Sequence, residues 1–236
     1  MCIRDRDRAK QLYSSFCNGE MLLTNATTAE MAKLTENSFR DVNIAFANEL
    51  SIISDKLGID VWELIELANH HPRVNILNPG PGVGGHCIAV DPWFIVSSAQ
   101  EEAKLIRTAR EVNDGKPAYV IAKITEAVEA EGADSIAALG IAFKPDIDDL
   151  RESPALSIVQ QMAEKWPEKN ILVAEPNVNE LPESLTAYQN VQLVDASHAI
   201  SSSPVVAVLV DHTPFKSLEK SVLEGKNVVD TRGMWS

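Results

Sequence analysis

The stretch Ser135-Ile136-Ala137-Ala138-Leu139-Gly140-Ile141-Ala142-Phe143 decides the fold of this 236-residue chain. Its apolar side chains follow one another without the alternation of a half-exposed strand, which is typical of a strand buried on both faces. Further short runs rich in Val, Ile and Leu follow at residues 171–174, 191–194, 205–210 and 227–230, with helical patterns between them at 154–166, 196–201 and 215–223. This alternation predicts an α/β fold with a parallel sheet that helices cover on both faces.

The residues before this sheet are predicted to be helical. A long helix is expected from about Asn25 to Leu57, with Thr27 or Thr28 as its N-cap. An apolar stripe recurs along it at three- and four-residue steps, and it consists of Phe39, Val42, Phe46, Leu50, Ile53 and Leu57. We expect this stripe to pack on a core or on a partner helix. The opposite side carries a second set, for which a solvated face is the alternative to a functional one: Lys33, Asn37, Arg40, Ile44 and Asn48.

Shorter helices are expected between the long helix and the sheet, at residues 61–69, 92–98, 102–112 and 117–131, and Pro117 is expected to open the last of them. We place a domain boundary near this proline. The prediction is an all-helical central domain over residues 25–116, followed by a connector helix and a Rossmann-like parallel α/β domain over residues 117–236. Residues 1–24 begin with alternating Arg and Asp, so we interpret them as a remnant or an artefactual N-terminus.

The composition excludes several classes of protein. A net charge of −13 argues against a nucleic-acid-binding protein, and no run of about 18 apolar residues predicts a membrane span. The three cysteines form neither a disulfide framework nor a paired metal motif, and no secretory signal is present. We therefore predict a cytoplasmic protein without a metal site.

A loop rich in glycine and proline follows the shorter helices, with the sequence Asn78-Pro79-Gly80-Pro81-Gly82-Val83-Gly84-Gly85-His86-Cys87-Ile88-Ala89-Val90-Asp91-Pro92. Glycines allow close approach of the backbone to a ligand, and prolines restrict the loop, so we interpret it as a nucleophile loop that presents the Cys87 thiol. One alternative is a tight structural turn with a buried cysteine. Another is a dinucleotide-binding G-x-G-x-x-G, which we reject because that motif must follow a strand, whereas His-Pro and Asn-Pro pairs precede this loop.

Charged residues follow the predicted strands, where ligands of open parallel sheets bind. These residues are Lys144, Glu175, Asp211, His212 and Arg232. Lys144 and Arg232, on loops expected to be neighbours, are suited to hold a pair of phosphates, and ordinary surface charge is the alternative.

Three motifs now occur in order along the chain: Lys33-x-x-x-Asn37, Cys87-x-x-x-Asp91 at the end of the glycine-rich loop, and Phe143-Lys144-Pro145-x-x-x-Asp149-x-Arg151-Glu152-Ser153-Pro154. Together they resemble the UDP-sugar 6-dehydrogenase family, over almost all of residues 20–236. Residues 33–50 and 71–77 are most similar to the members of this family that act on UDP-N-acetyl-D-mannosamine. The resemblance implies oxidation of the C6 alcohol of a UDP-sugar to a carboxylate, with two NAD+ used in succession.

The resemblance also implies roles for individual residues. Cys87 would be the nucleophile that carries a thioester, Lys33 and Asn37 would stabilise oxyanions and hold a water, and Asp91 would assist proton transfer or the hydrolytic water. Which of them takes the first alcohol proton stays open. The UDP-sugar would contact Lys144, Arg232, Gly84, Gly85, Phe143 and Arg73, the last from the same or a neighbouring subunit. Arg151 would contact the NAD pyrophosphate, and the long helix would form the core of a homodimer.

Members of that family begin with an NAD-binding Rossmann domain, and this sequence contains none. We therefore expect an incomplete enzyme that is inactive alone. The alternatives are UDP-glucose as the substrate, a non-catalytic UDP-sugar-binding and dimerisation module in which Cys87 is dispensable, and a cysteine hydrolase that uses His86 or His212 with Cys87.

Overall fold

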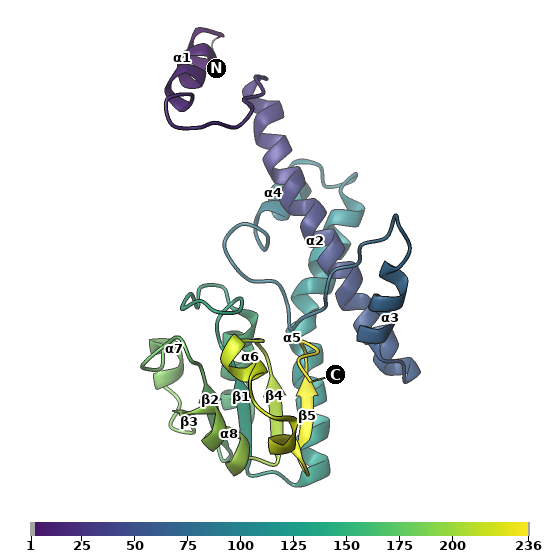
Figure 1. The fold of residues 1–236 in the computed structure, drawn as a ribbon, viewed down its shortest axis with the longest axis vertical. Coiled ribbons are helices and arrows are strands. Elements are labelled where there is room, and N and C mark those ends of the chain that lie inside the picture. Colours follow the sequence, from purple (N-terminus) through teal and green to yellow (C-terminus); the bar gives the residue numbers. More distant parts are fainter. Residues whose placement is uncertain (1–2, 236) are drawn as a thin grey trace.

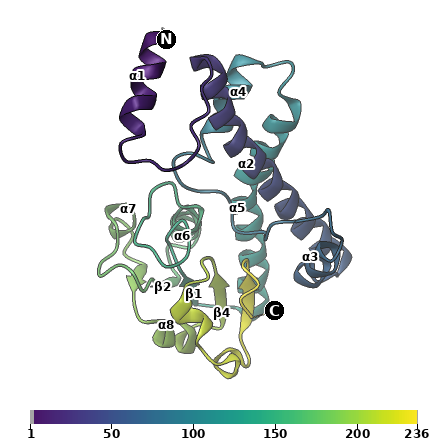
Figure 2. The same ribbon diagram turned by 45° about the horizontal axis from the view of Figure 1, so that its top comes forward.

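The computed structural model describes residues 3–235, which form a helical region around two long helices and an α/β region around one sheet (Figure 1; Figure 2). The helices are α1 (Ile3–Tyr13), α2 (Ala26–Leu57), α3 (Val61–Asn69), α4 (Asp91–Ser98), α5 (Lys104–Glu131), α6 (Pro154–Lys165), α7 (Glu183–Thr186), α8 (Ala196–Ser202) and α9 (Thr213–Lys216), with a 3-10 helix η1 (Lys220–Leu223). The strands are β1 (Ser135–Leu139), β2 (Asn170–Ala174), β3 (Val191–Leu193), β4 (Val205–Val208) and β5 (Asn227–Asp230).

The sheet has five strands in the order β3-β2-β1-β4-β5, and every neighbouring pair is parallel. Alternate residues of β1 serve opposite faces. Ile136 and Ala138 pack with α5 and α6, whereas Ala137 and Leu139 pack with α8 and Phe215. All four are completely buried, which explains why the sequence shows a continuous apolar run instead of an alternating one. The predicted doubly covered parallel sheet is confirmed.

Helix α2 has the predicted length but a different cap and a different buried face. Its N-cap is Asn25, whose side chain accepts the Thr28 N–H at 2.8 Å, so the prediction of Thr27 or Thr28 as the cap is wrong. Four members of its apolar stripe are 45–71% exposed: Phe39, Phe46, Ile53 and Leu57. The face that packs on α4 and α5 is instead polar or small, with Asn37, Ser38, Asp41, Ala45 and Asn48 buried. These four side chains therefore do not pack on a core within the described residues.

Helix α5 runs without interruption through Pro117, so the prediction of two separate helices is wrong. Proline has no N–H for the carbonyl four residues earlier, which here belongs to Asn113, but packing on both sides of the proline retains the helix. Arg110 and Asn113 bond to α2, whereas Val120, Ile124 and Val128 pack in the core under the sheet. Because the packing partners of α5 change across Pro117, we keep the domain boundary near residue 117 as a proposal.

Two smaller predictions also differ from the structure. The helix predicted over residues 215–223 is divided into α9 and η1. Residues 3–13, for which no apolar periodicity predicts a helix, form α1, which lies beyond the start of α2 (Figure 1).

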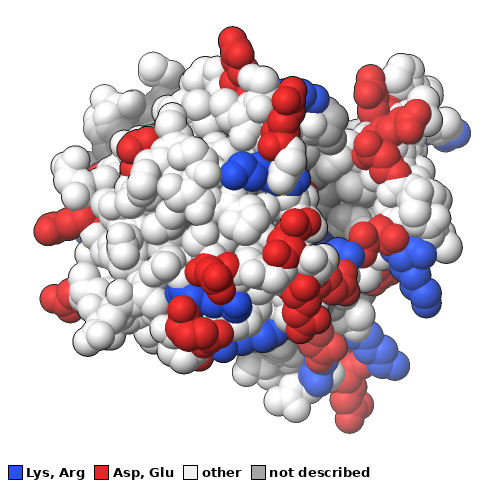
Figure 3. Space-filling model, turned by 90° about the horizontal axis from the view of Figure 1, so that it is seen from below, with Lys and Arg blue, Asp and Glu red and all other residues white. Residues whose placement is uncertain are grey.

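None of the helices in the described residues has the length and apolar character needed to cross a membrane. On the face seen from below, basic side chains lie among acidic ones and form no continuous basic surface (Figure 3).

Candidate active site

Residues 78–90, which we call the thiol loop, lie between α3 and α4 in irregular backbone. No strand precedes them in residues 3–77, so the structure supports rejection of the dinucleotide motif. Cys87 is exposed, and the alternative of a buried structural cysteine is wrong. The carbonyl oxygen of Cys87 accepts the Asp91 N–H at 2.8 Å, where α4 begins. The thiol is therefore held one turn from the Asp91 carboxylate.

Three of the four predicted catalytic residues form a row across the gap between α2 and α4. Asn37 is 8% exposed and donates from Nδ2 to Asp91 Oδ2 at 2.5 Å. The ammonium of Lys33 donates to Asn37 Oδ1 at 3.5 Å and to Glu36 Oε2 at 3.3 Å. A solvated face is thus the wrong interpretation for Asn37. The row places a cation, an amide and a carboxylate within reach of one polar substrate group.

The glycines of the thiol loop lie against residues of the α/β region. A Cβ atom on Gly84 would lie 2.5 Å from the Glu152 carbonyl oxygen and 3.1 Å from Phe143 Cβ. One on Gly85 would lie 3.3 Å from the Phe143 ring, and one on Gly80 would lie 2.6 Å from Arg232 Nη1. The structure therefore brings Gly84 and Gly85 against Phe143, and Gly80 against Arg232, whereas a shared ligand site for them stays a prediction. Side chains at these positions would push the loop away from that site.

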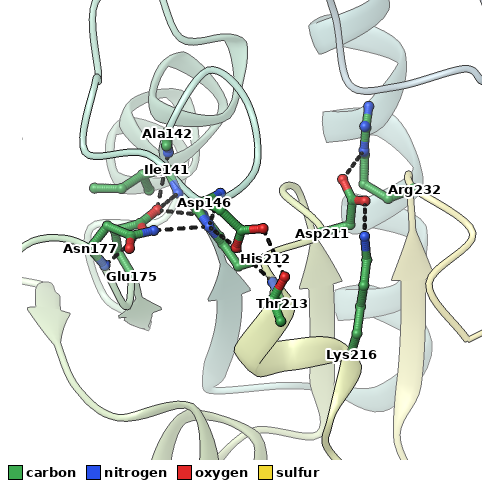
Figure 4. A network of polar contacts seen from close by, with 10 residues as sticks. All are labelled: Ile141, Ala142, Asp146, Glu175, Asn177, Asp211, His212, Thr213, Lys216 and Arg232. Carbon is green, nitrogen blue, oxygen red and sulfur yellow. Dashed lines mark hydrogen bonds and ion pairs between the residues drawn. The ribbon is translucent and has the colours of Figure 1, made fainter.

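Of the two cations predicted to hold phosphates, Arg232 is fixed by a carboxylate and Lys144 is not. Arg232 donates from Nε to Asp211 Oδ1 at 2.8 Å, and Lys216 pairs with Asp211 Oδ2 at 2.6 Å (Figure 4). Burial raises the pKa of Asp211, but the hydrogen bond from Lys216 and the charge of Arg232 outweigh it, so the pKa is lowered and the group stays ionised. Lys144 is exposed, with its ammonium 5.6 Å from the centroid of the Phe143 ring. We expected the loops of Lys144 and Arg232 to be neighbours. Strand β4 lies between β1 and β5, so the two loops are not adjacent and this expectation is wrong.

A buried network supports the loop that carries Phe143 and Lys144. Glu175 Oε2 accepts the N–H groups of Ile141 at 2.8 Å and Ala142 at 3.1 Å, and it lies 3.0 Å from His212 Nε2 (Figure 4). The Asp146 N–H donates to His212 Nδ1 at 3.0 Å, which assigns the proton of the imidazole to Nε2. His212 therefore acts here as a structural bridge, and Cys87 is not among its contacts. The sequence shows that Glu175 and His212 each follow a predicted strand, but it does not show that they pair.

The same loop is tied to α9 and bends sharply. Asp146 accepts the Thr213 N–H and hydroxyl, each at 2.8 Å. Asp146 and Glu152 have φ angles of 60° and 50°, in the left-handed region that non-glycine residues rarely adopt. These contacts hold a strained backbone in place beside the thiol loop.

Two predicted residues have no contact with the thiol. Arg151 is exposed and binds Asp149 with two nitrogens, at 2.8 and 2.6 Å, and these hydrogen bonds hold the pKa of Asp149 well below its ordinary value. Arg73 is exposed on a turn after α3, and among the described residues no hydrogen bond or ion pair joins its side chain to the site. Within residues 3–235, no group of three His, Cys, Asp or Glu side chains is arranged to hold a metal.

Comparison with known proteins agrees with this geometry. Residues 27–115 match the central domain of the UDP-glucose/GDP-mannose dehydrogenase family, and residues 137–236 match the UDP-binding domain of the same family. The chain belongs to this family. The two matched regions meet where the thiol loop contacts Phe143 and Arg232.

Named members of the family are similar over almost the whole chain. An NDP-N-acetyl-D-galactosaminuronic acid dehydrogenase of Ralstonia nicotianae is 56% identical over 98% of this chain and 53% of its own length. A UDP-N-acetyl-D-mannosamine dehydrogenase of Campylobacter jejuni is 62% identical over 88% of this chain and 51% of its own length. The solved structure of a UDP-D-ManNAc dehydrogenase from Pyrococcus horikoshii has a TM-score of 0.84 and 37% identity, and the match covers 99% of this chain and 55% of that one. This chain thus spans about half the length of the relatives it matches.

Proposed function

We propose that this chain supplies the nucleophile and the nucleotide-sugar site of an NAD-dependent UDP-sugar 6-dehydrogenase that acts on UDP-N-acetyl-D-mannosamine. The observation that carries the proposal is the contact between the thiol loop and Arg232, through Gly80. A UDP-sugar whose phosphates bind Arg232 and Lys144 would extend its sugar toward Cys87. The relatives named for N-acetylated sugars favour such a substrate over UDP-glucose.

The chemistry explains why these residue types are needed. At the aldehyde stage, C6 has no hydride to give until a nucleophile makes it tetrahedral, and the Cys87 thiolate would form that C–S bond. The oxyanion would be stabilised by Lys33 and by the Asn37 amide, which Asp91 orients through the 2.5 Å hydrogen bond. After removal of the hydride, water would cleave the thioester to a carboxylate and release the thiol, with Asp91 taking a proton from the water.

NAD would accept the hydrides in this proposal. In the described residues, Arg151 is the only group for which we propose a contact with it, and one exposed arginine paired with Asp149 does not make a dinucleotide site. Because this chain spans about half the length of the relatives it matches, we expect residues outside this sequence to hold NAD.

Protection of the thiol by a UDP-sugar tests this function. Saturating UDP-N-acetyl-D-mannosamine is expected to slow alkylation of Cys87 by iodoacetamide at least about tenfold, because the sugar would cover the thiol. Exposed Cys17 provides the internal control, since it lies outside the site and should react at an unchanged rate. Equal rates at Cys87 with and without ligand would favour the non-catalytic module instead.

NADH formation by the purified 236-residue chain is expected to be absent, and sustained turnover would contradict the incomplete-enzyme proposal.

We further propose a cytoplasmic homodimer in which the exposed stripe of α2 (Phe39, Phe46, Ile53 and Leu57) packs on its copy. Phe46→Arg is expected to weaken dimerisation by about 2 kcal/mol or more, roughly 30-fold, because it places a charge within an apolar interface. Sedimentation of the two proteins over a range of concentrations measures this shift. Val222→Arg changes an exposed apolar residue on η1 and should leave the dimer intact. A wild-type chain that stays monomeric would refute this arrangement.

A further inference from the structure

A chain of buried hydrogen bonds connects α5 to the thiol loop through α2. Arg110 Nη1 donates to Asp41 Oδ1 at 2.6 Å, and Asn113 Nδ2 donates to the same oxygen at 2.8 Å. Asn48 Nδ2 donates to Asn113 Oδ1 at 2.9 Å, and the Gly80 N–H donates to Asn48 Oδ1 at 2.9 Å. The four side chains are 0–1% exposed.

The direction of this chain is set by its ends. Asp41 offers Asn113 two acceptors, its side-chain Oδ1 and its backbone carbonyl oxygen at 3.1 Å, so Asn113 turns its NH2 group toward Asp41 and its oxygen toward Asn48. Asn48 must then offer its NH2 group to Asn113, which leaves its oxygen for the Gly80 N–H. Each amide is therefore held in one orientation, and the acceptor for Gly80 is fixed in place.

Packing of two helices does not require such a chain. Asparagine is a poor helix former, and both Asn48 and Asn113 lie in the interior of long helices. Burial of polar groups costs free energy that hydrogen bonds only offset, whereas apolar residues would pack α2 on α5 without that cost. The end of the chain at a loop backbone therefore points to a role in the loop.

Gly80 lies at the point where the thiol loop meets the nucleotide side of the site. A Cβ on Gly80 would lie 2.6 Å from Arg232 Nη1. Two residues further along, a Cβ on Gly82 would lie 3.3 Å from Pro117 Cγ. Pro117 follows Asn113 by one turn of α5, so one short segment of α5 supports the loop twice, by the amide chain and by the proline ring.

We propose that Asn48 and Asn113 are positioning residues, which hold Gly80 so that the Arg232 guanidinium and the Cys87 thiol face the same ligand. This inference rests on the proposed function, because it takes that ligand to be a UDP-sugar. Two asparagines that take no part in the reaction would thus hold the thiol loop in a fixed position relative to Arg232.

Asn48→Leu in the 236-residue chain tests the inference. With the acceptor removed, hydrogen exchange of the Gly80 amide is expected to be at least about tenfold faster, and the Kd for UDP about tenfold weaker, at a temperature well below unfolding. Ile124→Ala is the control for lost packing, since Ile124 is fully buried on α5, the helix of Asn113, but lies in the core under the sheet. It should lower the Tm and leave both readouts unchanged.

A purely structural role of Asn48 would make the two variants alike, with a lower Tm but an unchanged Kd and unchanged exchange at Gly80, and that result would overturn the inference. If Asn48→Leu does not fold, Asn113→Ala serves in its place, because it frees the Asn48 amide without removing it. Failure of the wild-type chain to bind UDP would refute the proposed function. Exchange at Gly80 would then still decide whether Asn48 holds the loop.

Discussion

Replacement of Arg232 by methionine is expected to weaken the binding of UDP about 100-fold, or about 3 kcal/mol. The guanidinium is already oriented, because Asp211 accepts from its Nε at 2.8 Å and the backbone of Gly80 faces its Nη1. Its remaining N–H groups are therefore available to a phosphate without a further loss of side-chain freedom. Methionine retains most of the apolar stem but cannot donate a hydrogen bond. Calorimetric titration with UDP measures the change.

Lys226→Met is the control for this prediction. Lys226 precedes β5, at the opposite end of the strand from Arg232, and donates to the Ser201 carbonyl oxygen. Its replacement removes the same formal charge at the other end of β5, so the control shows how much a change of net charge alone weakens the binding of UDP. An Arg232→Met affinity within threefold of that of Lys226→Met would show that Arg232 is not a phosphate ligand.

The sheet could be predicted from the sequence because its three central strands, β2, β1 and β4, are almost completely buried and each is a short apolar run followed by a helical pattern. The packing partner of α2 could not be predicted in the same way. Periodicity correctly gave one apolar and one polar side of the helix, but it does not say which side faces the rest of the chain. The polar side faces α5 here, where Asp41, Asn48, Arg110 and Asn113 form hydrogen bonds with one another.

The candidate site was predictable where its residues share a short motif. Asn37 and Asp91 are 54 positions apart, yet each belongs to a motif of the family that the sequence resembles, and the structure joins them. The supporting network was not predictable, because the hydrogen bonds of Glu175 and His212 depend on the strand order and on the path of the loop after β1. Local sequence contains neither piece of information.

That supporting network predicts the largest effect on stability. Glu175→Ala is expected to lower the free energy of unfolding by about 3–5 kcal/mol, because it leaves the N–H groups of Ile141 and Ala142 and the Nε2–H of His212 buried without an acceptor. Urea denaturation at pH 7 measures the loss. Glu175→Gln should cost less, about 1–2 kcal/mol, because an amide oxygen in place of Oε2 still accepts from all three donors. Only the weaker bonds from Asn177, at 3.2 and 3.4 Å to Oε1, would then meet an NH2 group.

The substitution Glu175→Ala should also change how the free energy of unfolding depends on pH. Burial raises the pKa of Glu175, but the hydrogen bonds from His212 and the Ile141 N–H outweigh it, so the folded pKa lies below the ordinary value of 4.5. Folding therefore favours the ionised carboxylate, whose contribution is complete above about pH 4.5 and is lost as the pH falls through the folded pKa. The stability difference between the wild type and Glu175→Ala should accordingly be constant from pH 7 to pH 5 and shrink below that. A difference that grows on acidification would mean that Glu175 is protonated in the folded chain. The hydrogen bond between His212 Nε2 and Glu175 Oε2 would then need a different assignment of its proton.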